Sequence, residues 1–207
     1  FIYKFVSRDP VRPGGYAANR DLLDHGTLYA ARFDAGGQGV WLALTPGTRG
    51  LSAPSGLADP AEVVIHARLA AGAAGATPMD RPEWIAVHPQ TGEVFVTLTN
   101  NSQRGTPETP GLNAANPRPA NIFGHIIRWR ENNGDAAASS FEWDIFALAG
   151  DPKNADDNRR GNVKGDAYGS PDGLWFDPSG RLWRQRNFFS VKIFRRVHRD
   201  GNLSLSG

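Results

Sequence analysis

The chain has 207 residues, of which 40% are hydrophobic and 21% charged, and its formal net charge is +2 at pH 7. It contains no cysteine, which excludes disulfides, thiolate nucleophiles and thiolate metal ligands among these residues. No apolar run approaches the roughly 20 residues of a membrane-spanning helix, so we expect no membrane insertion.

Composition and spacing predict an all-β fold. The 24 glycines and 15 prolines separate short apolar runs, which is typical of strands joined by turns. Most tryptophans are expected to pack between sheets. A helix is predicted at residues 61–74, where leucine and alanine are spaced helically. Alternation predicts strands at residues 26–34, 39–44, 124–131 and 140–148.

A hairpin is predicted from residues 84–88 and 93–99. Bulky and β-branched side chains alternate in both segments. The Pro-Gln-Thr-Gly sequence between them is typical of a turn, because proline presets φ and glycine can adopt a positive φ. A guanidinium, a carboxylate and two amides should therefore face a polar site at one end of this hairpin. These flanking residues are Arg81, Glu83, Asn100 and Asn101.

An internal repeat is the strongest sign of organisation. Residues 82–96 (PEWIAVHPQTGEVFV) return as residues 171–183 (PDGLWFDPSGRLW) at an offset of 89 residues. Two blades of about 45 residues fit this offset. We therefore expect a β-propeller in which Glu83 and Asp172 face the channel mouth from blades that are separated by one neighbour. A β-sandwich is the competing architecture.

Two long segments lack the pattern of a regular element. Residues 102–121 contain four prolines and almost no apolar side chain, so they form either a binding loop or a plain surface excursion. Residues 150–169 carry neighbouring acids, but the calcium-loop template fails at Arg160. A solvated acidic turn is the default interpretation there.

The residue types are equally compatible with metal and anion binding and with a structural ion pair. Signatures of serine hydrolases, phosphate-binding loops, zinc proteases and dinucleotide binding are absent from the sequence. Glu83, Asp172 and Asn100 supply the hard oxygen donors that Ca²⁺ prefers, with Asn101 as the alternative amide. Arg81 could bind phosphate with its planar fork, and a structural ion pair between Arg81 and Glu83 is the alternative.

Four separated stretches resemble the PhoX-type alkaline phosphatase family, in that family's order. They are ATPMDRPEWIAVHPQTGEVFVTLTNNS, NIFGHIIRWRE, FEWDIFALAGD and GSPDGLWFDPSGRLW, and the resemblance spans residues 1–183. It implies a six-bladed propeller that binds calcium and iron at one end of its channel. It also implies hydrolysis of phosphate monoesters in the periplasm or outside the cell, after export by the twin-arginine route.

By that resemblance, Arg81 contacts phosphate and Glu83 ligates a metal, so these are the predicted catalytic residues. Asp172 is implied as a further carboxylate of the site. Arg128, in the GHIIRW stretch, is a weaker candidate for a second phosphate contact. The implied cofactors, Ca²⁺ and Fe³⁺, would gather the phosphate oxygens for in-line attack.

The resemblance also implies that the site needs residues from elsewhere. Family members are much longer, and their N-terminal half supplies metal ligands, including a cysteine that this sequence lacks. We therefore expect this chain to form about four blades, to be the C-terminal part of a phosphatase and to be inactive alone. The alternatives are a noncatalytic propeller that binds a partner and a lactonase-like calcium propeller, whose blade motif is similar to residues 171–174.

The last residues differ in character from the rest. Between Arg181 and Arg199 there are seven basic residues and no acid, whereas the first 180 residues carry 16 basic and 20 acidic side chains. A basic run can bind nucleic acid, but a solvated or aberrant terminus is preferred, and no nucleic-acid partner is expected. We predict a partial propeller over residues 1–183 and a poorly packed tail, frameshifted or disordered, over residues 184–207.

Overall fold

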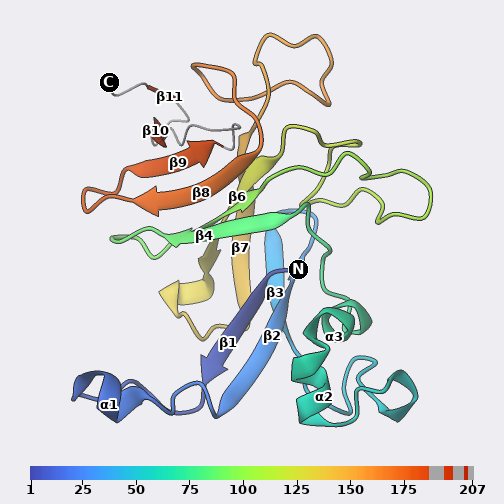
Figure 1. Ribbon diagram of the computed structural model, residues 1–207, viewed down its shortest axis with the longest axis vertical. Coiled ribbons are helices and arrows are strands. Elements are labelled where there is room, and N and C mark those ends of the chain that lie inside the picture. Colours follow the sequence, from blue (N-terminus) through green and yellow to red (C-terminus); the bar gives the residue numbers. More distant parts are fainter. Residues whose placement is uncertain (187–193, 198–202, 205–207) are drawn as a thin grey trace.

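The computed structural model describes residues 1–186 and the backbone of residues 194–197 and 203–204 (Figure 1). The all-β expectation is confirmed, because the described chain is mostly antiparallel sheet with a few short helices. The first sheet contains β1 (Tyr3–Ser7), β2 (Gly26–Phe33), β3 (Gln38–Ala43), β4 (Pro82–Val87), β5 (Val94–Leu98), β6 (His125–Glu131) and β7 (Ser140–Leu148). The second contains β8 (Pro171–Phe176), β9 (Leu182–Arg186), β10 (Phe194–Val197) and β11 (Leu203–Ser204).

The first sheet has the strand order β1-β2-β3-β7-β6-β5-β4. Strands β4 and β5 are the predicted hairpin, and the four other predicted strands correspond to β2, β3, β6 and β7. Strand β3 meets β7 over a short register that runs from Gln38–Glu142 to Val40–Ser140. The β1–β3 part and the β4–β7 part of the sheet are therefore joined along a narrow seam.

The second copy of the sequence repeat lies directly beside the first (Figure 1). The hydroxyl of Thr97 in β5 donates to the carbonyl oxygen of Asp172 in β8 at 2.8 Å. The hydroxyl of Thr99 donates to the carbonyl oxygen of Pro171 at 2.9 Å. The predicted separation of the two copies by an intervening blade is therefore wrong. Strands β4–β7 with their long loops fill the 89-residue offset, because loops add length without adding strands.

The predicted helix at residues 61–74 is two short helices, α2 (Pro60–Ile65) and α3 (Ala67–Ala73). Asp59 caps α2 by accepting a hydrogen bond from the Ala61 N–H at 2.8 Å. The break falls at His66, whose φ of −104° and ψ of 36° are not helical. Buried residues of both helices pack against β2 and β3. The remaining short helices are α1 (Gly15–Asn19) and the 3-10 turns Ala53–Ser55 and Asn132–Gly134.

An aromatic core holds the two parts of the first sheet together. Its buried rings, which meet at centroid distances between 5.1 and 6.4 Å, are Phe33, Trp41, Trp129 and Phe141. Trp129 is therefore packed as expected. Trp84 and Trp175 are 52% and 55% exposed, so the packing prediction is wrong for these two. Trp84 lies on β4, the last strand in the order of its sheet, so no further strand of that sheet pairs with β4 in the described part of the chain.

Strand β9 runs through the boundary predicted at residue 183. Arg184 is fully buried, and its guanidinium carbon lies 3.9 Å from the centre of the Tyr168 ring. Most of the predicted tail, including Phe188 and Phe189, lies outside the described residues. No helix in the described part of the chain combines the length and the apolar character needed to cross a membrane.

Candidate functional site

Arg81 and Glu83 flank the proline that begins β4. Arg81 has a φ of 48°, a left-handed conformation that non-glycine residues rarely adopt. Ser170 has a φ of 49° at the equivalent place before Pro171. Such a conformation costs about 1–3 kcal/mol and persists only where its surroundings hold it. The two copies of the repeat therefore share a strained turn directly before each carboxylate.

Each strand then carries an irregularity at its carboxylate. The register of β4 against β5 shifts after Pro82, and that of β8 against β9 shifts after Pro171. A β-bulge re-aims the side chains within it and is frequent beside active sites. Glu83 and Asp172 lie within these two irregularities, at the start of their strands.

The hydroxyl of Thr97 joins the two carboxylate-bearing segments. It accepts a hydrogen bond from the backbone N–H of Trp84, the residue after Glu83, at 3.0 Å. It also donates to the carbonyl oxygen of Asp172. Thr97 is fully buried, so this bridge is shielded from water. The structure thus brings the segments of the predicted residues Glu83 and Asp172 together, through a threonine that sequence reasoning missed.

Asn100 lies beside the same segment. Its Nδ2 donates to the hydroxyl oxygen of Ser170 at 3.3 Å, two residues before Asp172. Its Oδ1 has no hydrogen-bond partner in the described part of the chain. Asn100 can therefore offer an oxygen ligand on the side of the site next to β8.

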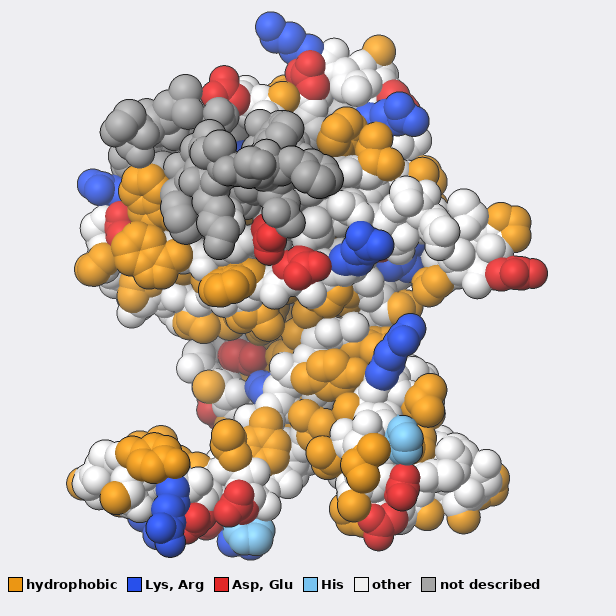
Figure 2. Space-filling view, in the orientation of Figure 1, with side chains coloured by type: hydrophobic (Ala, Val, Ile, Leu, Met, Phe, Trp, Pro, Cys, Tyr) orange, Lys and Arg blue, Asp and Glu red, His pale blue; other side chains and the backbone are white. Residues whose placement is uncertain are grey.

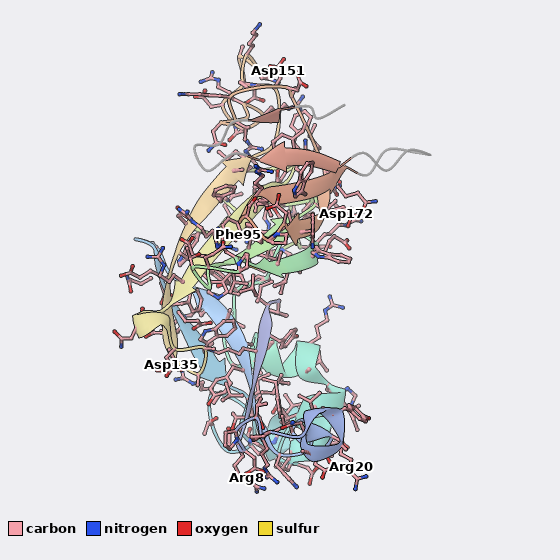
Figure 3. The ribbon with its side chains drawn as sticks, turned by 90° about the vertical axis from the view of Figure 1, so that its left-hand side faces the viewer. Arg8, Arg20, Phe95, Asp135, Asp151 and Asp172 are labelled. Atoms are coloured by element: carbon pink, nitrogen blue, oxygen red, sulfur yellow. The ribbon has the colours of Figure 1, made fainter. Side chains whose placement is uncertain are left out.

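Among the described residues, the charged side chains of the site have no partners. Within the described residues, Arg81, Glu83 and Asp172 form no ion pair and no side-chain hydrogen bond. Arg81 and Glu83 are exposed and Asp172 is half-buried. Figure 3 shows Asp172 at the edge of the molecule, whereas Phe95 lies inside it. The alternative of a structural ion pair between Arg81 and Glu83 is therefore wrong.

The donors on this chain fit only part of a metal site. Ca²⁺ takes six to eight oxygen ligands. The two carboxylates and the Asn100 amide have the right chemistry but are too few for that number. The described residues also contain no group of three or more His, Cys, Asp or Glu side chains that could hold a metal ion. Any metal held here therefore needs further ligands.

Arg128 lies away from this site. Its Nε is 3.0 Å from Oδ1 of Asp144 and its Nη2 is 2.5 Å from Oδ2, and this bidentate pair raises the pKa of Arg128. It stands opposite Phe95, three residues from the site end of β6, or about 10 Å along the strand. The structure does not bring Arg128 beside Arg81, so its placement does not support a second phosphate contact.

Comparison with known proteins identifies the family. The model of the family described as "Alkaline phosphatase PhoX" matches residues 1–204. The chain belongs to this family. The solved structure of Pseudomonas fluorescens PhoX in complex with vanadate, a transition state analogue, is 45% identical and superposes with a TM-score of 0.87. The match covers 97% of this chain and 38% of that one. No curated protein matches the chain.

The PhoX match and the resemblance in the sequence agree on the family but differ in extent. The family model continues past residue 183 to residue 204, across the strands β9, β10 and β11. The chain spans 38% of the length of the Pseudomonas fluorescens protein. More than half of that relative therefore has no counterpart among these residues.

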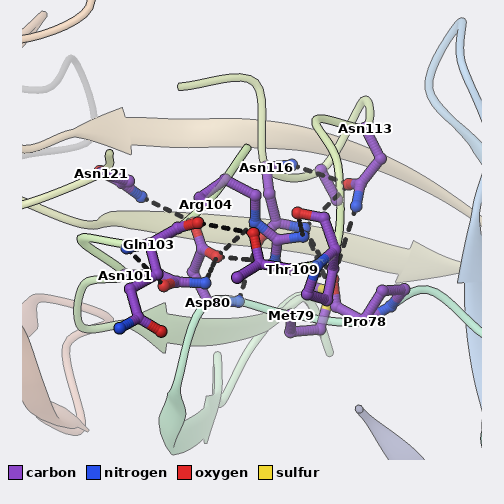
Figure 4. A network of polar contacts seen from close by, with 12 residues as sticks. Pro78, Met79, Asp80, Asn101, Gln103, Arg104, Thr109, Asn113, Asn116 and Asn121 are labelled. Atoms are coloured by element: carbon purple, nitrogen blue, oxygen red, sulfur yellow. Dashed lines mark hydrogen bonds and ion pairs between the residues drawn. The ribbon is translucent and has the colours of Figure 1, made fainter. Parts of the chain in front are cut away.

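In this PhoX-family chain, a buried polar network surrounds Asp80, the residue before Arg81 (Figure 4). Asp80 is fully buried, and its Oδ1 accepts hydrogen bonds from Nε of Arg104 at 2.7 Å and from Nδ2 of Asn101 at 2.9 Å. Its Oδ2 accepts from Nδ2 of Asn121 at 3.0 Å. Sequence reasoning missed Asp80 and Arg104, because two charged residues 24 positions apart carry no local pattern.

The loop at residues 102–121 is not a plain surface excursion. It lacks regular structure, as predicted, but four of its polar side chains are almost fully buried. These are Arg104, Asn116, Arg118 and Asn121. The loop therefore packs mainly through hydrogen-bonded polar groups, with Ala115 as its buried apolar residue.

His125, at the start of β6, belongs to the same network. Its Nε2 lies 2.7 Å from the carbonyl oxygen of Ala115, and its Nδ1 lies 3.1 Å from Nδ2 of Asn121. Burial lowers the pKa of His125 to about 4. The imidazole is therefore neutral at pH 7, with Nε2–H donating to Ala115 and Nδ1 accepting from Asn121.

An apolar groove of about 1070 Å³ lies between β4 and β8. Figure 2 shows hydrophobic side chains exposed in this region of the molecule. Its lining includes Trp84, Ile85, Val87, Leu174 and Trp175, but neither Glu83 nor Asp172. Neither carboxylate therefore lines the groove, although each directly precedes residues that do.

Proposed function

We propose that this chain forms part of a phosphomonoesterase that releases inorganic phosphate from phosphate monoesters. The observation that carries the proposal is the bridge through Thr97. It holds the backbone beside Glu83 next to that of Asp172. Arg81, two residues before Glu83, has a guanidinium without a partner among the described residues. A guanidinium without a carboxylate partner can bind phosphate oxygens bidentately. Further support comes from the 45% identical PhoX that was solved with vanadate, a transition state analogue.

In this proposal, Arg81 binds the phosphoryl group and stabilises the charge that develops on its oxygens. Glu83, Asp172 and Asn100 contribute oxygen ligands to a metal site, and the remaining ligands come from residues beyond this chain. We propose Ca²⁺ and Fe³⁺ as the metals, on the basis of the family resemblance. When bound, such cations neutralise phosphate oxygens and orient them for in-line displacement.

We further propose that the complete fold is a six-bladed propeller. The four-stranded unit β4–β7 and the neighbouring sheet β8–β11 have the size of propeller blades. Their first strands, β4 and β8, carry the two carboxylates. The ring is completed by residues that this chain does not contain, and the chain is inactive without them. We also propose export to the periplasm or the cell exterior, for which the family resemblance is the support.

A noncatalytic binding module is the second candidate. The groove beside Trp84 and Trp175 favours it, because exposed apolar patches of this kind commonly mark interaction surfaces. A lactonase-like calcium hydrolase is the third alternative. The three hypotheses differ in which substrate, if any, is hydrolysed and in whether hydrolysis requires Glu83.

The test is an assay of p-nitrophenyl phosphate and a lactone, with and without Ca²⁺, on a complete PhoX enzyme that carries this chain. We expect phosphate release that depends on Ca²⁺ and falls at least 100-fold in Glu83→Gln. Glu93→Gln is the matched control, because Glu93 pairs with Arg130 on the outer part of the hairpin. Turnover of the lactone alone, or of neither substrate, would refute the proposal.

A further inference from the structure

Asp80, which forms a buried ion pair with Arg104, directly precedes the candidate phosphate-binding residue Arg81 in the chain. We propose that this pair is a positioning device, which fixes the backbone segment that carries Arg81 and so aims its guanidinium at the phosphoryl group. This inference rests on the proposed phosphatase function. Asp80 and Arg104 touch neither substrate nor metal in this proposal, and both act through the backbone of Arg81.

The pair is well isolated from water. The side chain of Asp80 is 0% exposed and that of Arg104 is 1% exposed, and Nη2 of Arg104 lies 2.6 Å from Oδ1 of Asp80. Asn101 and Asn121 also donate to this carboxylate, at Oδ1 and Oδ2 respectively. A buried carboxylate with this number of donors has a single orientation.

The guanidinium of Arg104 also donates hydrogen bonds to three backbone carbonyl oxygens. Its Nη1 donates to the carbonyl oxygens of Pro110 at 3.3 Å and Gly111 at 3.0 Å, and its Nη2 donates to that of Pro78 at 3.2 Å. The same cation therefore ties the loop at residues 102–121 to the segment that leads into Arg81. A lysine has the charge but not the fork needed for these contacts.

The backbone on each side of Arg81 is held as well. The N–H of Asp80 donates to Oδ1 of Asn116 at 2.9 Å, and the N–H of Arg81 donates to the carbonyl oxygen of Met79 at 3.1 Å. The carbonyl oxygen of Arg81 accepts from the N–H of Thr99 at 3.1 Å. A left-handed backbone conformation is strained for an arginine before a proline. These hydrogen bonds to the neighbouring backbone hold Arg81 in that conformation.

The turn at Ser170 provides an internal comparison. It has the same left-handed φ before a proline, but the residue before Ser170 is Gly169, which carries no side chain. The buried ion pair is therefore specific to the copy of the repeat that carries Arg81. That distribution fits a role in aiming the guanidinium more closely than a role in forming the turn.

The test is a double-mutant cycle in a complete PhoX enzyme that carries this chain. Asp80→Asn is combined with Arg81→Asn, because asparagine tolerates a left-handed backbone. We expect Asp80→Asn to lower kcat/KM for p-nitrophenyl phosphate by about 100-fold, and to raise the inhibition constants of inorganic phosphate and vanadate. In the Arg81→Asn background, we expect Asp80→Asn to change kcat/KM by less than about threefold, because residues that act as a unit are not additive.

Glu131→Gln is the control for a purely structural effect. Glu131 pairs with Lys4 at 3.2 Å and is largely buried, but it lies in the β1–β7 region at the other end of β6. We expect this variant to lower the melting temperature and to leave the phosphate inhibition constant unchanged. If Asp80→Asn does not fold, Arg104→Lys replaces it in the cycle, since lysine keeps the charge and loses the fork.

Additive effects of the two substitutions would overturn the positioning role, as would an unchanged inhibition constant in folded Asp80→Asn or Arg104→Lys enzyme. If the enzyme without these substitutions releases no phosphate from p-nitrophenyl phosphate, the proposed function itself is refuted. The two failures are therefore distinguishable.

Discussion

The hydroxyl of Thr97 in β5 donates a hydrogen bond of 2.8 Å to the carbonyl oxygen of Asp172 in β8. The hydroxyl oxygen of Thr97 also accepts a hydrogen bond from the N–H of Trp84, so one buried side chain links β4 in the first sheet to β8 in the second. The relative position of Glu83 and Asp172 depends on this bridge.

Thr97→Val is expected to break the bridge while keeping the shape of the side chain. It leaves the Trp84 N–H and the Asp172 carbonyl oxygen without their partner, which costs about 1–3 kcal/mol of unfolding free energy. It should also lower kcat/KM about tenfold or more. Urea unfolding and steady-state kinetics measure the two effects. Thr106→Val, whose exposed hydroxyl bonds within its own loop, should change neither, and equal effects of the two variants would contradict the prediction.

Gly124 is expected to tolerate no side chain. Its φ is +76°, and an added Cβ would overlap the carbonyl oxygens of Leu98 and Thr99. Gly124→Ala should therefore cost more than about 2 kcal/mol, since both strain and overlap contribute. Gly134 has a similar φ of +68° with nothing near its Cβ position, so Gly134→Ala should cost only about 1 kcal/mol. Thermal unfolding of both variants tests whether the space, and not φ alone, decides the cost.

His125 is expected to make stability depend on pH. Its pKa is about 4 in the folded protein and 6.5 in the reference state, so the unfolded protein binds more protons between these values. The free energy of unfolding should therefore fall as the pH falls from about 6.5 to 4, by roughly 3 kcal/mol from this group. His125→Gln removes the titration. Urea titrations at several pH values should show a smaller slope for this variant, and parallel curves would disprove the assignment.

Glu131 is expected to contribute stability without contributing to catalysis. It accepts hydrogen bonds from Lys4 and from the indole nitrogens of Trp41 and Trp129, in a site where burial lowers the pKa of Lys4. Glu131→Gln leaves the ammonium without its counter-charge and should cost about 3 kcal/mol. A melting temperature equal to that of the unmodified protein would show that the pair is not stabilising.

Local patterns in the sequence predicted much of the fold. The β4–β5 hairpin and strands β2, β3, β6 and β7 follow from period-two alternation. The split of the predicted helix at His66 was missed, because a broken turn between two good helical segments leaves little trace in composition. The exposure of Trp84 was also missed, since a tryptophan on the last strand of a sheet has the same local pattern as one between strands.

The amino-acid sequence by itself determined the family, the β-rich class and the pairing of a proline with a carboxylate at the start of two strands, because these are local features. Only the tertiary structure decided that β8 lies directly beside β5, that Asp80 is buried against Arg104, and that Arg128 is held by Asp144. Those contacts join residues brought together by long loops. Whether a charged side chain is buried, paired or free depends on which loop packs over it. The spacing of residues along the chain does not predict that packing.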